Sequence, residues 1–385
     1  MTILEKKADN PIGHLTPEDI ENLGRELDAI REQLIASRGE RDARYIRRLI
    51  KFNRGLELGS RTLLLASLFP PAWILGTVGL SLSKILDNME IGHNILHGQW
   101  DWMRDPKIHS TTWDWDNATP AKQWQHAHNE LHHTYTNVIG KDNDLGYGIM
   151  RVDEDQPWTK ANLGQPLYNF VNMLFFQYGI AAYDLDLGRN LRTKKRRQDP
   201  EFRPNAKAVV RKIGRQSTKD YIVHPLLSLV TGSFFHTLAA NAVANLVRNV
   251  WSHSVIMCGH FPEGVETFSR RSIVGETRGE WYLRQMLGSA NISGGKLIHL
   301  LSGNLSYQIE HHIYPDLNSN RYQEVAPKVR EVFDRYGLKY VTGPMPKQVA
   351  SAWWKVIRLS FPNDFLRLNN RHKVIEQPRD REFAA

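Results

Sequence analysis

The sequence predicts an all-α protein: an integral membrane bundle of two transmembrane helical hairpins, with a cytosolic helical cap that holds three histidine clusters. Residues 62–83 and residues 221–247 contain no Asp, Glu, Lys or Arg and are predominantly apolar. Each stretch is long enough to cross a bilayer as a helix. The histidine clusters have the one-turn or adjacent spacing that gathers side chains on one side of a helix. Together these observations favour helices throughout, with large polar parts outside the lipid.

The composition argues against a secreted protein built on disulfides. The chain has 385 residues, 41% of them apolar, and a single cysteine, Cys258. The net charge of +9 is concentrated in runs such as residues 38–54 and 194–215. No nucleic-acid fold signature accompanies these runs, so we expect no nucleic-acid partner. Anionic membrane lipids or an acidic protein are the partners that the charge favours.

Three regions are predicted along the chain. Residues 1–54 form an N-terminal soluble amphipathic helical region, residues 55–345 form the membrane domain, and residues 346–385 form a C-terminal basic, amphipathic tail. The first region opens with a helix start, in which a threonine is followed by proline and two acids. Apolar residues then recur at helical spacing, at Leu23, Leu27, Ile30 and Leu34. This spacing predicts a helix packed on the body of the protein.

The densest histidine cluster lies in residues 125–134. His128 and His132 are one helical turn apart and share a face, with His133 next to them around the helix. Three imidazoles can therefore point at one small volume, a spacing that suits metal ligation. His126, on nearly the same side of the helix as His133, is a weaker candidate.

Two further clusters have the same character. His93 and His97 are one turn apart, and Gln308 precedes the adjacent pair His311 and His312. A single pair of histidines at this spacing is more often structural, but three such clusters in one chain favour metal binding. Neutral imidazole suits iron, zinc and copper, and seven clustered imidazoles exceed what one tetrahedral zinc needs. We interpret the clusters as ligands of two metal ions.

A shared metal site constrains the membrane topology. If each apolar stretch crossed once, the first two clusters and the third would face opposite sides. We therefore interpret residues 55–92 and 220–257 as two hairpins, with Pro70 and Pro71 at a kink or at the turn of the first. The basic flanks favour the cytoplasmic side for all three clusters. Between the hairpins, the apolar and aromatic residues 167–183 predict a helix that lies on the membrane surface.

One more ligand is expected beyond the second hairpin. His260 lies just past the membrane on the same side as the clusters and offers an imidazole from a different element. His253, two turns earlier, is the competing choice.

Two other classes of protein compete with this interpretation. Glu90 and Glu130 stand three residues before His93 and His133, the Glu-x-x-His spacing of soluble ferritin-like di-iron carboxylate enzymes. That fold would leave the remaining histidines and the apolar stretches unexplained. The second class is a membrane protein that only binds or transports metal, for which intramembrane ionisable residues or repeat symmetry would be expected. Neither feature is evident in the sequence.

The three clusters, placed after apolar hairpins, resemble the histidine boxes of the membrane fatty-acid desaturase and hydroxylase superfamily. The flanking segments GKDNDLGYGI, MCGHFPEG and GNLSYQIEHHIYPDL are most similar to bacterial acyl-CoA desaturases. The resemblance implies a non-haem di-iron centre, with His260 as the additional ligand. The implied metal ligands are His93, His97, His128, His132, His133, His260, His311 and His312. Gln308 heads the third box, and an amide is a poorer iron ligand than an imidazole.

The resemblance also implies the reaction. The expected activity is insertion of a cis double bond into a long-chain acyl group, with O2 as co-substrate. The implied substrate is an acyl-CoA, desaturated at carbon 9, or an acyl lipid. Hydroxylation at the same centre is the closest alternative. The expected location is a bacterial inner membrane, with several membrane crossings. Carboxylates near the ligands are candidates to accept the second ring N–H of a histidine: Asp87, Glu90, Glu130, Glu310 and Asp316.

Electrons are expected from a separate protein. The chain has no Gly-rich dinucleotide fingerprint, no cysteine set for an iron–sulfur cluster, and no His-Pro-Gly-Gly haem signature. A ferredoxin or flavin reductase is therefore implied, and the basic run at residues 194–215 is a candidate docking surface for it.

Overall fold

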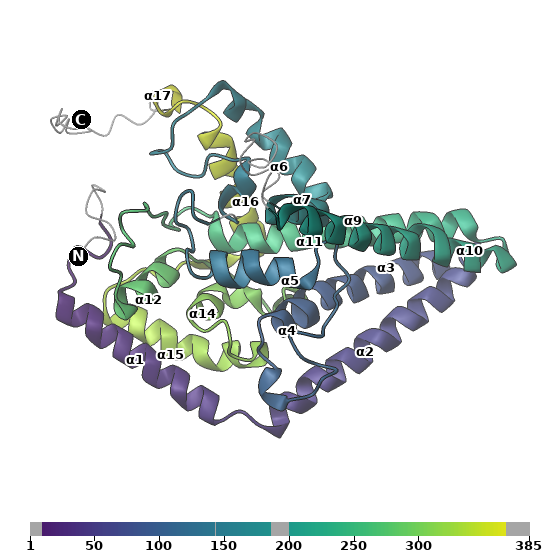
Figure 1. Ribbon diagram of the computed structural model, residues 1–385, viewed down its shortest axis with the longest axis horizontal. Helices are drawn as coiled ribbons and strands as arrows, with labels where there is room; N and C mark the ends of the chain where they lie inside the picture. Colours follow the sequence, from purple (N-terminus) through teal and green to yellow (C-terminus); the bar gives the residue numbers. More distant parts are fainter. Residues whose placement is uncertain (1–9, 143, 186–199, 367–385) are drawn as a thin grey trace.

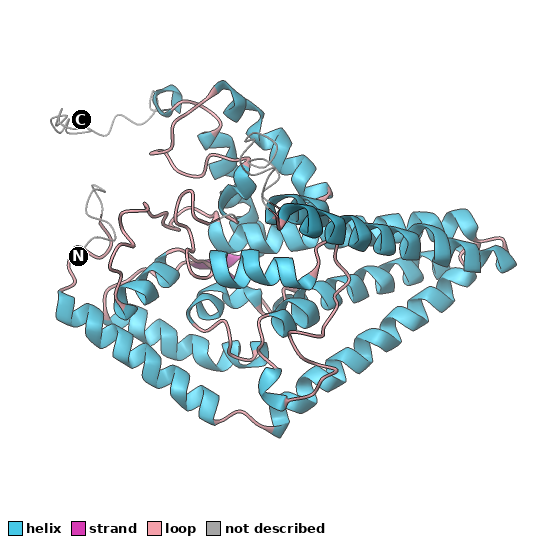
Figure 2. Cartoon of the chain, viewed as in Figure 1, coloured by secondary structure: helices cyan, strands magenta, loops and turns pink. Residues whose placement is uncertain are grey.

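The computed structural model describes residues 10–142, 144–185 and 200–366, and this part of the chain is predominantly helical. Figure 2 shows helices throughout and a single small sheet. That sheet pairs β1 (Asn291–Ser293) with β2 (Thr342–Pro344) in parallel, with Asn291 opposite Thr342. The predicted all-α class is confirmed, and the sheet only ties the chain before the third histidine box to its C-terminal part.

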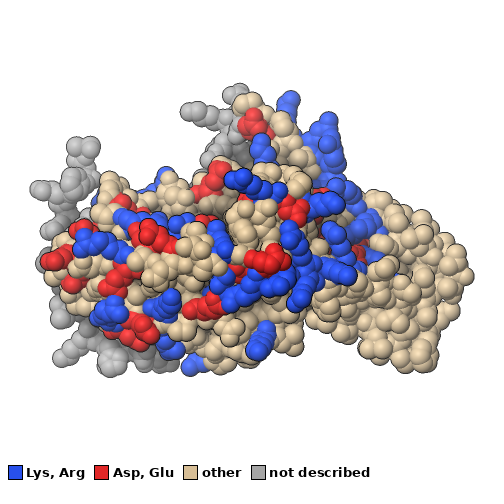
Figure 3. Space-filling model, turned by 90° about the horizontal axis from the view of Figure 1, so that it is seen from below, with Lys and Arg blue, Asp and Glu red and all other residues tan. Residues whose placement is uncertain are grey.

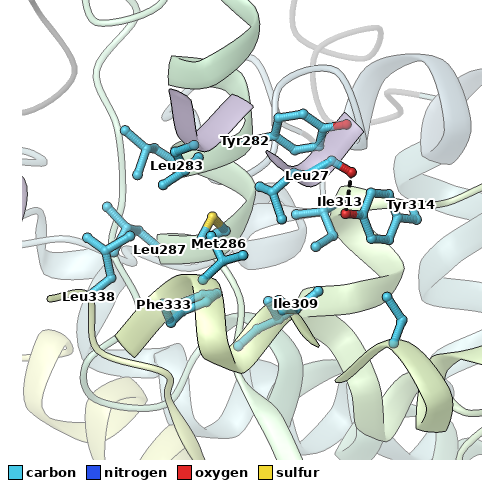
Figure 4. Close-up of a cluster of buried hydrophobic side chains, with 14 of the residues drawn as sticks. Leu27, Tyr282, Leu283, Met286, Leu287, Ile309, Ile313, Tyr314, Phe333 and Leu338 are labelled. Atoms are coloured by element: carbon cyan, nitrogen blue, oxygen red, sulfur yellow. Dashed lines mark hydrogen bonds between the residues drawn. The ribbon is translucent and has the colours of Figure 1, made fainter. Parts of the chain in front are cut away.

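The N-terminal helix α1 (Pro17–Ala36) begins where the sequence predicts. Thr16 caps it and forms a capping box with Asp19, whose carboxylate accepts the Thr16 backbone N–H at 2.8 Å. Its apolar face packs against α12 (Arg278–Leu287) and α15 (Tyr322–Arg335). Figure 4 shows Leu27 of α1 among the side chains of this core. The Tyr314 hydroxyl donates to the Leu27 carbonyl at 2.7 Å, so α1 is held directly against the segment that follows the third box.

Helices α2 (Glu40–Leu65) and α3 (Pro70–Leu86) form the first antiparallel pair (Figure 1). The turn lies at residues 66–69, so Pro70 and Pro71 begin the second helix of the pair, where a missing backbone N–H is tolerated. Gly79 permits close packing, because a Cβ there would stand 2.3 Å from the Ser60 hydroxyl. The chain continues from α3 through η1 (Asp87–His93) and α4 (Asn94–Leu96) into the first histidine box.

The second pair is longer than predicted. Helix α9 (Phe202–Thr218) continues through η7 (Lys219–Val223) and α10 (His224–Leu227) without a turn. The chain reverses after η8 (Ser228–Thr231) at Gly232, whose φ of 75° suits glycine, and returns as α11 (Phe234–His260). Helix α11 packs on α3 and carries the chain back to the histidine boxes.

The predicted surface helix at residues 167–183 is two helices. The first is α6 (Gln165–Leu174) and the second is α7 (Phe176–Asp184), with a break at Phe175. The remaining short elements are η2 (Asp101–Met103), α5 (Ala121–Trp124), η3 (Gln125–His132), η4 (Leu145–Gly148), η5 (Lys160–Gly164), α13 (Lys296–Leu301), η9 (Leu305–Tyr307), α14 (Gln308–Ile313), η10 (Ser319–Arg321), α16 (Met345–Leu359) and α17 (Asn363–Leu366).

A buried ionic cluster joins the two helix pairs. The Lys84 ammonium of α3 lies 2.7 Å from a carboxylate oxygen of both Asp116 and Asp220. Lys219 also donates to Asp116 at 2.9 Å, and the Arg248 guanidinium of α11 donates to the Asp116 carbonyl at 2.7 Å. Because these charges pair across four segments, they fix the pairs relative to the loop that leads to the second box.

The turns of both pairs meet at one end of the molecule. The Ser233 hydroxyl donates to the Leu65 carbonyl at 3.0 Å, which brings the two turns together. Large apolar side chains are exposed at this end, among them Leu68, Phe69, Leu75, Leu227, Val230 and Phe235. Figure 3 shows it as a lobe almost without charge. Within the described residues, no helix combines the length and the hydropathy that a transmembrane span requires.

The predicted region boundaries fall inside helices. The boundary after residue 54 lies within α2, and the one after residue 345 lies within α16. Residues 1–9 and 367–385 of the terminal regions, and residues 194–199 of the predicted basic docking run, lie outside the described residues.

Candidate metal centre

Four segments deliver the predicted histidines to one place. The first box lies on η1 and α4, the second on η3, the additional histidine at the end of α11, and the third on α14. Both η1 and η3 are π-helices, a widened form that is frequent at functional sites. In η3 the His133 N–H donates to the His128 carbonyl five residues earlier, at 3.0 Å. The His128 and His132 rings still stack, with centroids 5.0 Å apart.

The histidines form two adjacent groups. One nitrogen from each member of the first group lies within 4.8 Å of the others, and the same holds for the second. The first group is His93, His97, His128 and His311; the second is His132, His260 and His312. Within the groups, Nε2 atoms of His93 and His311 are 3.4 Å apart, and those of His260 and His312 are 3.1 Å apart. Two imidazole nitrogens on one metal ion would lie about 3 Å apart.

His133 lies between the groups. Its ring stacks on His312 of the second group, with centroids 4.5 Å apart, and meets the rings of His97 and His311 of the first at 4.7 and 4.8 Å. The structure therefore brings all eight predicted ligands together, each of them buried or nearly so. It does the same for no other histidine among the described residues.

The donor atoms fit metal ions. The Nε2 atoms of His97 and His128 and both ring nitrogens of His133 are buried without a hydrogen-bond partner among the described residues. An unpaired buried polar atom is unfavourable, and a metal ion would satisfy it. Burial, and then the neighbouring imidazoles, hold the pKa of His97, His128 and His133 well below the usual value. These rings are therefore neutral, the form that binds metal.

Two aspartates that sequence reasoning missed orient the second box. Asp142 accepts from Nδ1 of His132 at 2.9 Å, and Asp144 accepts from Nδ1 of His128 at 2.9 Å. Each bond leaves Nε2 of its histidine free for a metal. Burial alone would lower the pKa of His132, but Asp142 and Asp144 raise it to about 9. Both aspartates stand in the segment GKDNDLGYGI, so their signal was two acids shortly after the box.

Neutral groups hold three further rings. The Nδ1 atom of His311 lies 3.1 Å from the Tyr322 hydroxyl, and that of His312 lies 3.1 Å from the Gln285 amide oxygen. Nδ1 of His260 lies 3.2 Å from the carbonyl of Gly288. These partners lie 11 to 28 residues from their histidines, and sequence spacing alone gave no signal for them.

The five carboxylates expected in this role have other partners in the described hydrogen bonds. Asp87 accepts from the Asp116 backbone N–H, and Glu90 accepts from Tyr45 and Ser319. Glu130 pairs with His126, Glu310 accepts from Asn291 and Tyr340, and Asp316 accepts from Arg31. None of the five therefore orients a histidine of the metal groups, and the expectation is wrong for Asp87, Glu90, Glu130, Glu310 and Asp316. Glu90 and Glu310 are instead buried in hydrogen-bond networks beside the first and third boxes.

The structure also places the other candidate ligands, His253, His126 and Gln308. The His253 ring points away from the groups, and its Nε2 lies 3.0 Å from the Asn169 amide oxygen. His126 is exposed and pairs with Glu130 at 2.6 Å, which also removes Glu130 from a ferritin-like carboxylate site. Gln308 is buried with its Nε2 3.0 Å from Nε2 of His260, and its amide oxygen has no partner among the described residues.

A helical protein that gathers seven imidazoles into two adjacent groups, with an eighth between them, has the donor set of a dinuclear non-haem metal site. Residues 66–344 match the family model described as fatty acid desaturase, and the chain belongs to this family. It is an enzyme of the desaturase class, and the rival metal-binding and ferritin-like classes are set aside.

Proteins with similar sequences are also desaturases. The chain is similar to the NADPH-dependent stearoyl-CoA 9-desaturase of Mycobacterium tuberculosis, with 48% identity over 373 residues, 96% of this chain and 87% of the relative. It is similar at 24% identity to the sn-1 linoleoyl-lipid 6-desaturase of Synechocystis, over 73% of this chain and 78% of that one. No solved structure matches the chain.

Proposed function

We propose that the protein is a membrane acyl-CoA desaturase that places a cis double bond at carbon 9 of a saturated long-chain acyl group. Two irons are held by the eight histidines, O2 is the co-substrate, and a separate ferredoxin or flavin reductase supplies electrons. The observation that carries the proposal is the convergence of eight imidazoles, seven in two groups and His133 between them, several with nitrogens that lack a partner among the described residues.

Each part of the site has a task in this proposal. When bound, the irons supply the oxidising power to remove two hydrogens from an unactivated methylene chain, which side-chain acids and bases lack. Burial favours the neutral form of His97, His128 and His133, whereas Asp142 and Asp144 favour a proton on His132 until a metal binds. Asp142, Asp144, Tyr322 and Gln285 fix the orientation of their rings. Burial of the histidines also keeps bulk water from the oxidising centre.

The substrate follows from the relatives. The similar mycobacterial protein, which acts on stearoyl-CoA, shares 48% identity over nearly the whole chain. The relatives named for lipid-linked substrates share about half that identity over less of the chain. This difference supports a CoA-linked saturated substrate over an acyl lipid.

The exposed apolar surfaces support a membrane location with several crossings. The uncharged end formed by the two helix pairs carries Leu68, Val230 and Phe235 on its surface. Helix α6 exposes Leu167 and Phe170 on one face and buries Asn169 on the other, as expected of a helix at a membrane surface. In this arrangement the helix pairs enter the inner membrane of a bacterium from the cytoplasm, with the metal centre on the cytoplasmic side.

Expression in a host that lacks unsaturated fatty acids, together with a compatible reductase, tests the proposal. Mass spectrometry of the lipids should find a 9-olefin, and the purified protein should contain about two irons. His132→Ala and His311→Ala should abolish the olefin and lower the iron content, whereas His126→Ala should retain both. A hydroxylated product would reassign the reaction, and full activity in either of the first two variants would refute the ligand set.

A further inference from the structure

A groove opens between the two helix pairs, next to the metal centre. It consists of two adjoining cavities of about 440 and 400 Å³ that share Glu57, Asp87 and Asp114 in their walls. The first is bounded by α2 and η1, and the second extends to Arg215 and Lys219 on the other helix pair. Indole side chains from one loop line both cavities: Trp113 the first and Trp115 the second.

An unbroken series of aromatic rings leads from this groove to the candidate metal ligands. The Trp115 ring lies 5.1 Å from the Trp124 ring, centroid to centroid. Trp124 stacks on His128 at 4.4 Å with an interplanar angle of 20°, and it meets His93 at 5.1 Å. Both indoles are almost fully buried, so no solvent separates the rings. Two ring contacts thus connect the groove with the first histidine group.

Arg54 and Arg215 line the groove, and basic side chains continue from them along both helix pairs. On α2 they are Arg48, Lys51 and Arg54; on α9 they recur every fourth residue at Arg203, Lys207 and Arg211, in line with Arg215 at the groove. All six are exposed and form no ion pair with another described residue. Figure 3 shows Lys and Arg gathered beside the uncharged end of the molecule.

The lining of the groove carries charges of both signs. It includes four carboxylates, Glu57, Asp87, Asp114 and Asp116, and five cations, Arg54, Lys84, Lys107, Arg215 and Lys219. Because three of these cations already pair with Asp114 or Asp116, a phosphate-bearing small molecule inside the groove would compete with carboxylates for them. The free basic charges instead extend along two helices, over roughly 12 Å on α9 at 1.5 Å per residue. That spread matches the broad acidic face of a protein better than one cluster of phosphates.

We propose that this groove docks the acidic face of the electron donor, and that electrons reach the metal centre through Trp115 and Trp124. The proposal rests on the proposed function and adds the place of electron entry. In each cycle the donor supplies two electrons, either from one reduced flavin or from two iron–sulfur proteins that are each oxidised by one electron. Those electrons, two protons from solvent and the two hydrogens removed from the acyl chain reduce one O2 to two waters.

Charge reversal tests the docking surface. The iron-loaded full chain is mixed in neutral nanodiscs with a reduced acidic plant-type [2Fe–2S] ferredoxin, and oxidation of the ferredoxin is followed by stopped flow. The wild-type rate should fall with ionic strength. Arg48→Glu, Lys51→Glu, Lys207→Glu and Arg211→Glu combined should lower the low-salt rate at least about tenfold, because steering by opposite charge is lost. Reduction by dithionite should be unchanged.

The matched control reverses four exposed basic residues on α1 and α15: Arg25, Lys328, Arg330 and Arg335. It carries the same charge change and should leave the ferredoxin rate within about twofold of wild type. A wild-type rate that is independent of salt, or equal losses in both variants, would overturn the docking surface. A raised KM for stearoyl-CoA with an unchanged ferredoxin rate would assign the groove to the substrate instead.

Replacement of Trp115 tests the electron path. Trp115→Leu should lower the ferredoxin oxidation rate at saturating ferredoxin, with iron content and dithionite reduction retained, and Trp115→Phe should restore much of the rate. An unchanged rate in Trp115→Leu would overturn the path. If the dithionite-reduced wild type forms no olefin from stearoyl-CoA and O2, the proposed function itself fails, independently of docking.

Discussion

Asp142 accepts a hydrogen bond from Nδ1 of His132 at 2.9 Å, and the same carboxylate accepts the backbone N–H groups of Asn137 and Asp144 at 2.8 and 2.9 Å. The loop after the second box therefore folds back on the helix that carries the box. Because Nδ1 donates, the proton of His132 is held on that atom and Nε2 faces the second histidine group. A carboxylate partner also makes the imidazole a stronger ligand.

This bond predicts the effect of Asp142→Asn. The amide is nearly isosteric but uncharged, so we expect iron affinity or turnover to fall by about 10–100-fold. Iron bound in competition with a chelator, and olefin formed per iron, measure the two effects. Glu130→Gln is the control, because this carboxylate lies on η3, the helix that carries the second box, but pairs with exposed His126. Equal losses in the two variants would contradict the assignment.

The ligand role of His260 is testable against that of His253. His260→Ala removes a ring from the second histidine group and should lower bound iron. His253→Ala removes a ring that contacts Asn169, and the iron content should stay at the wild-type level. Iron per chain, measured on folded protein from a gel-filtration peak, decides between them. Loss of iron only in His253→Ala would exchange the two roles.

Local features of the chain were predictable because they depend on neighbours in sequence. The capping box at Thr16, the apolar face of α1 and the pairing of histidines within each box follow from helical periodicity. For Pro70 and Pro71 the sequence left a kink and a turn as alternatives, and the structure has the turn, with proline in the first turn of α3.

Features that depend on tertiary contacts were not predictable. His253 and His260 are two turns apart on one face of α11, about 10 Å along the helix axis. Which of the two histidines joins the metal groups depends on where α11 contacts the boxes, and this is a tertiary feature. Asp142 reaches His132 because the chain reverses at Asn137, whose φ is 57°. Nor could spacing show that Glu130 points to solvent, since one helix carries it beside buried histidines.

The buried Lys84 predicts a large effect on stability. In Lys84→Met the carboxylates of Asp116 and Asp220 lose their shared cation, so we expect a loss of about 3–5 kcal/mol in the free energy of unfolding. Arg44→Met removes an exposed i,i+4 pair with Glu40 and should change it by about 0–1 kcal/mol. Chemical denaturation in one detergent compares the variants. Similar changes in both would show that the cluster does not join the helix pairs.

The exposed apolar end predicts where the lipid lies. Val230 is 85% exposed at the joined turns, whereas Arg48 lies further along α2, among charged residues. In lipid vesicles, a cysteine introduced as Val230→Cys should resist a charged, membrane-impermeant maleimide, because thiolate formation and reagent access both require water. In Arg48→Cys the thiol should react within minutes.

The native Cys258 is fully buried, so wild-type protein treated with the same maleimide sets the background labelling. Dissolving the vesicles in denaturant should expose both thiols equally. Rapid labelling at position 230 before that step would place the joined turns in water and remove the helix pairs from the membrane.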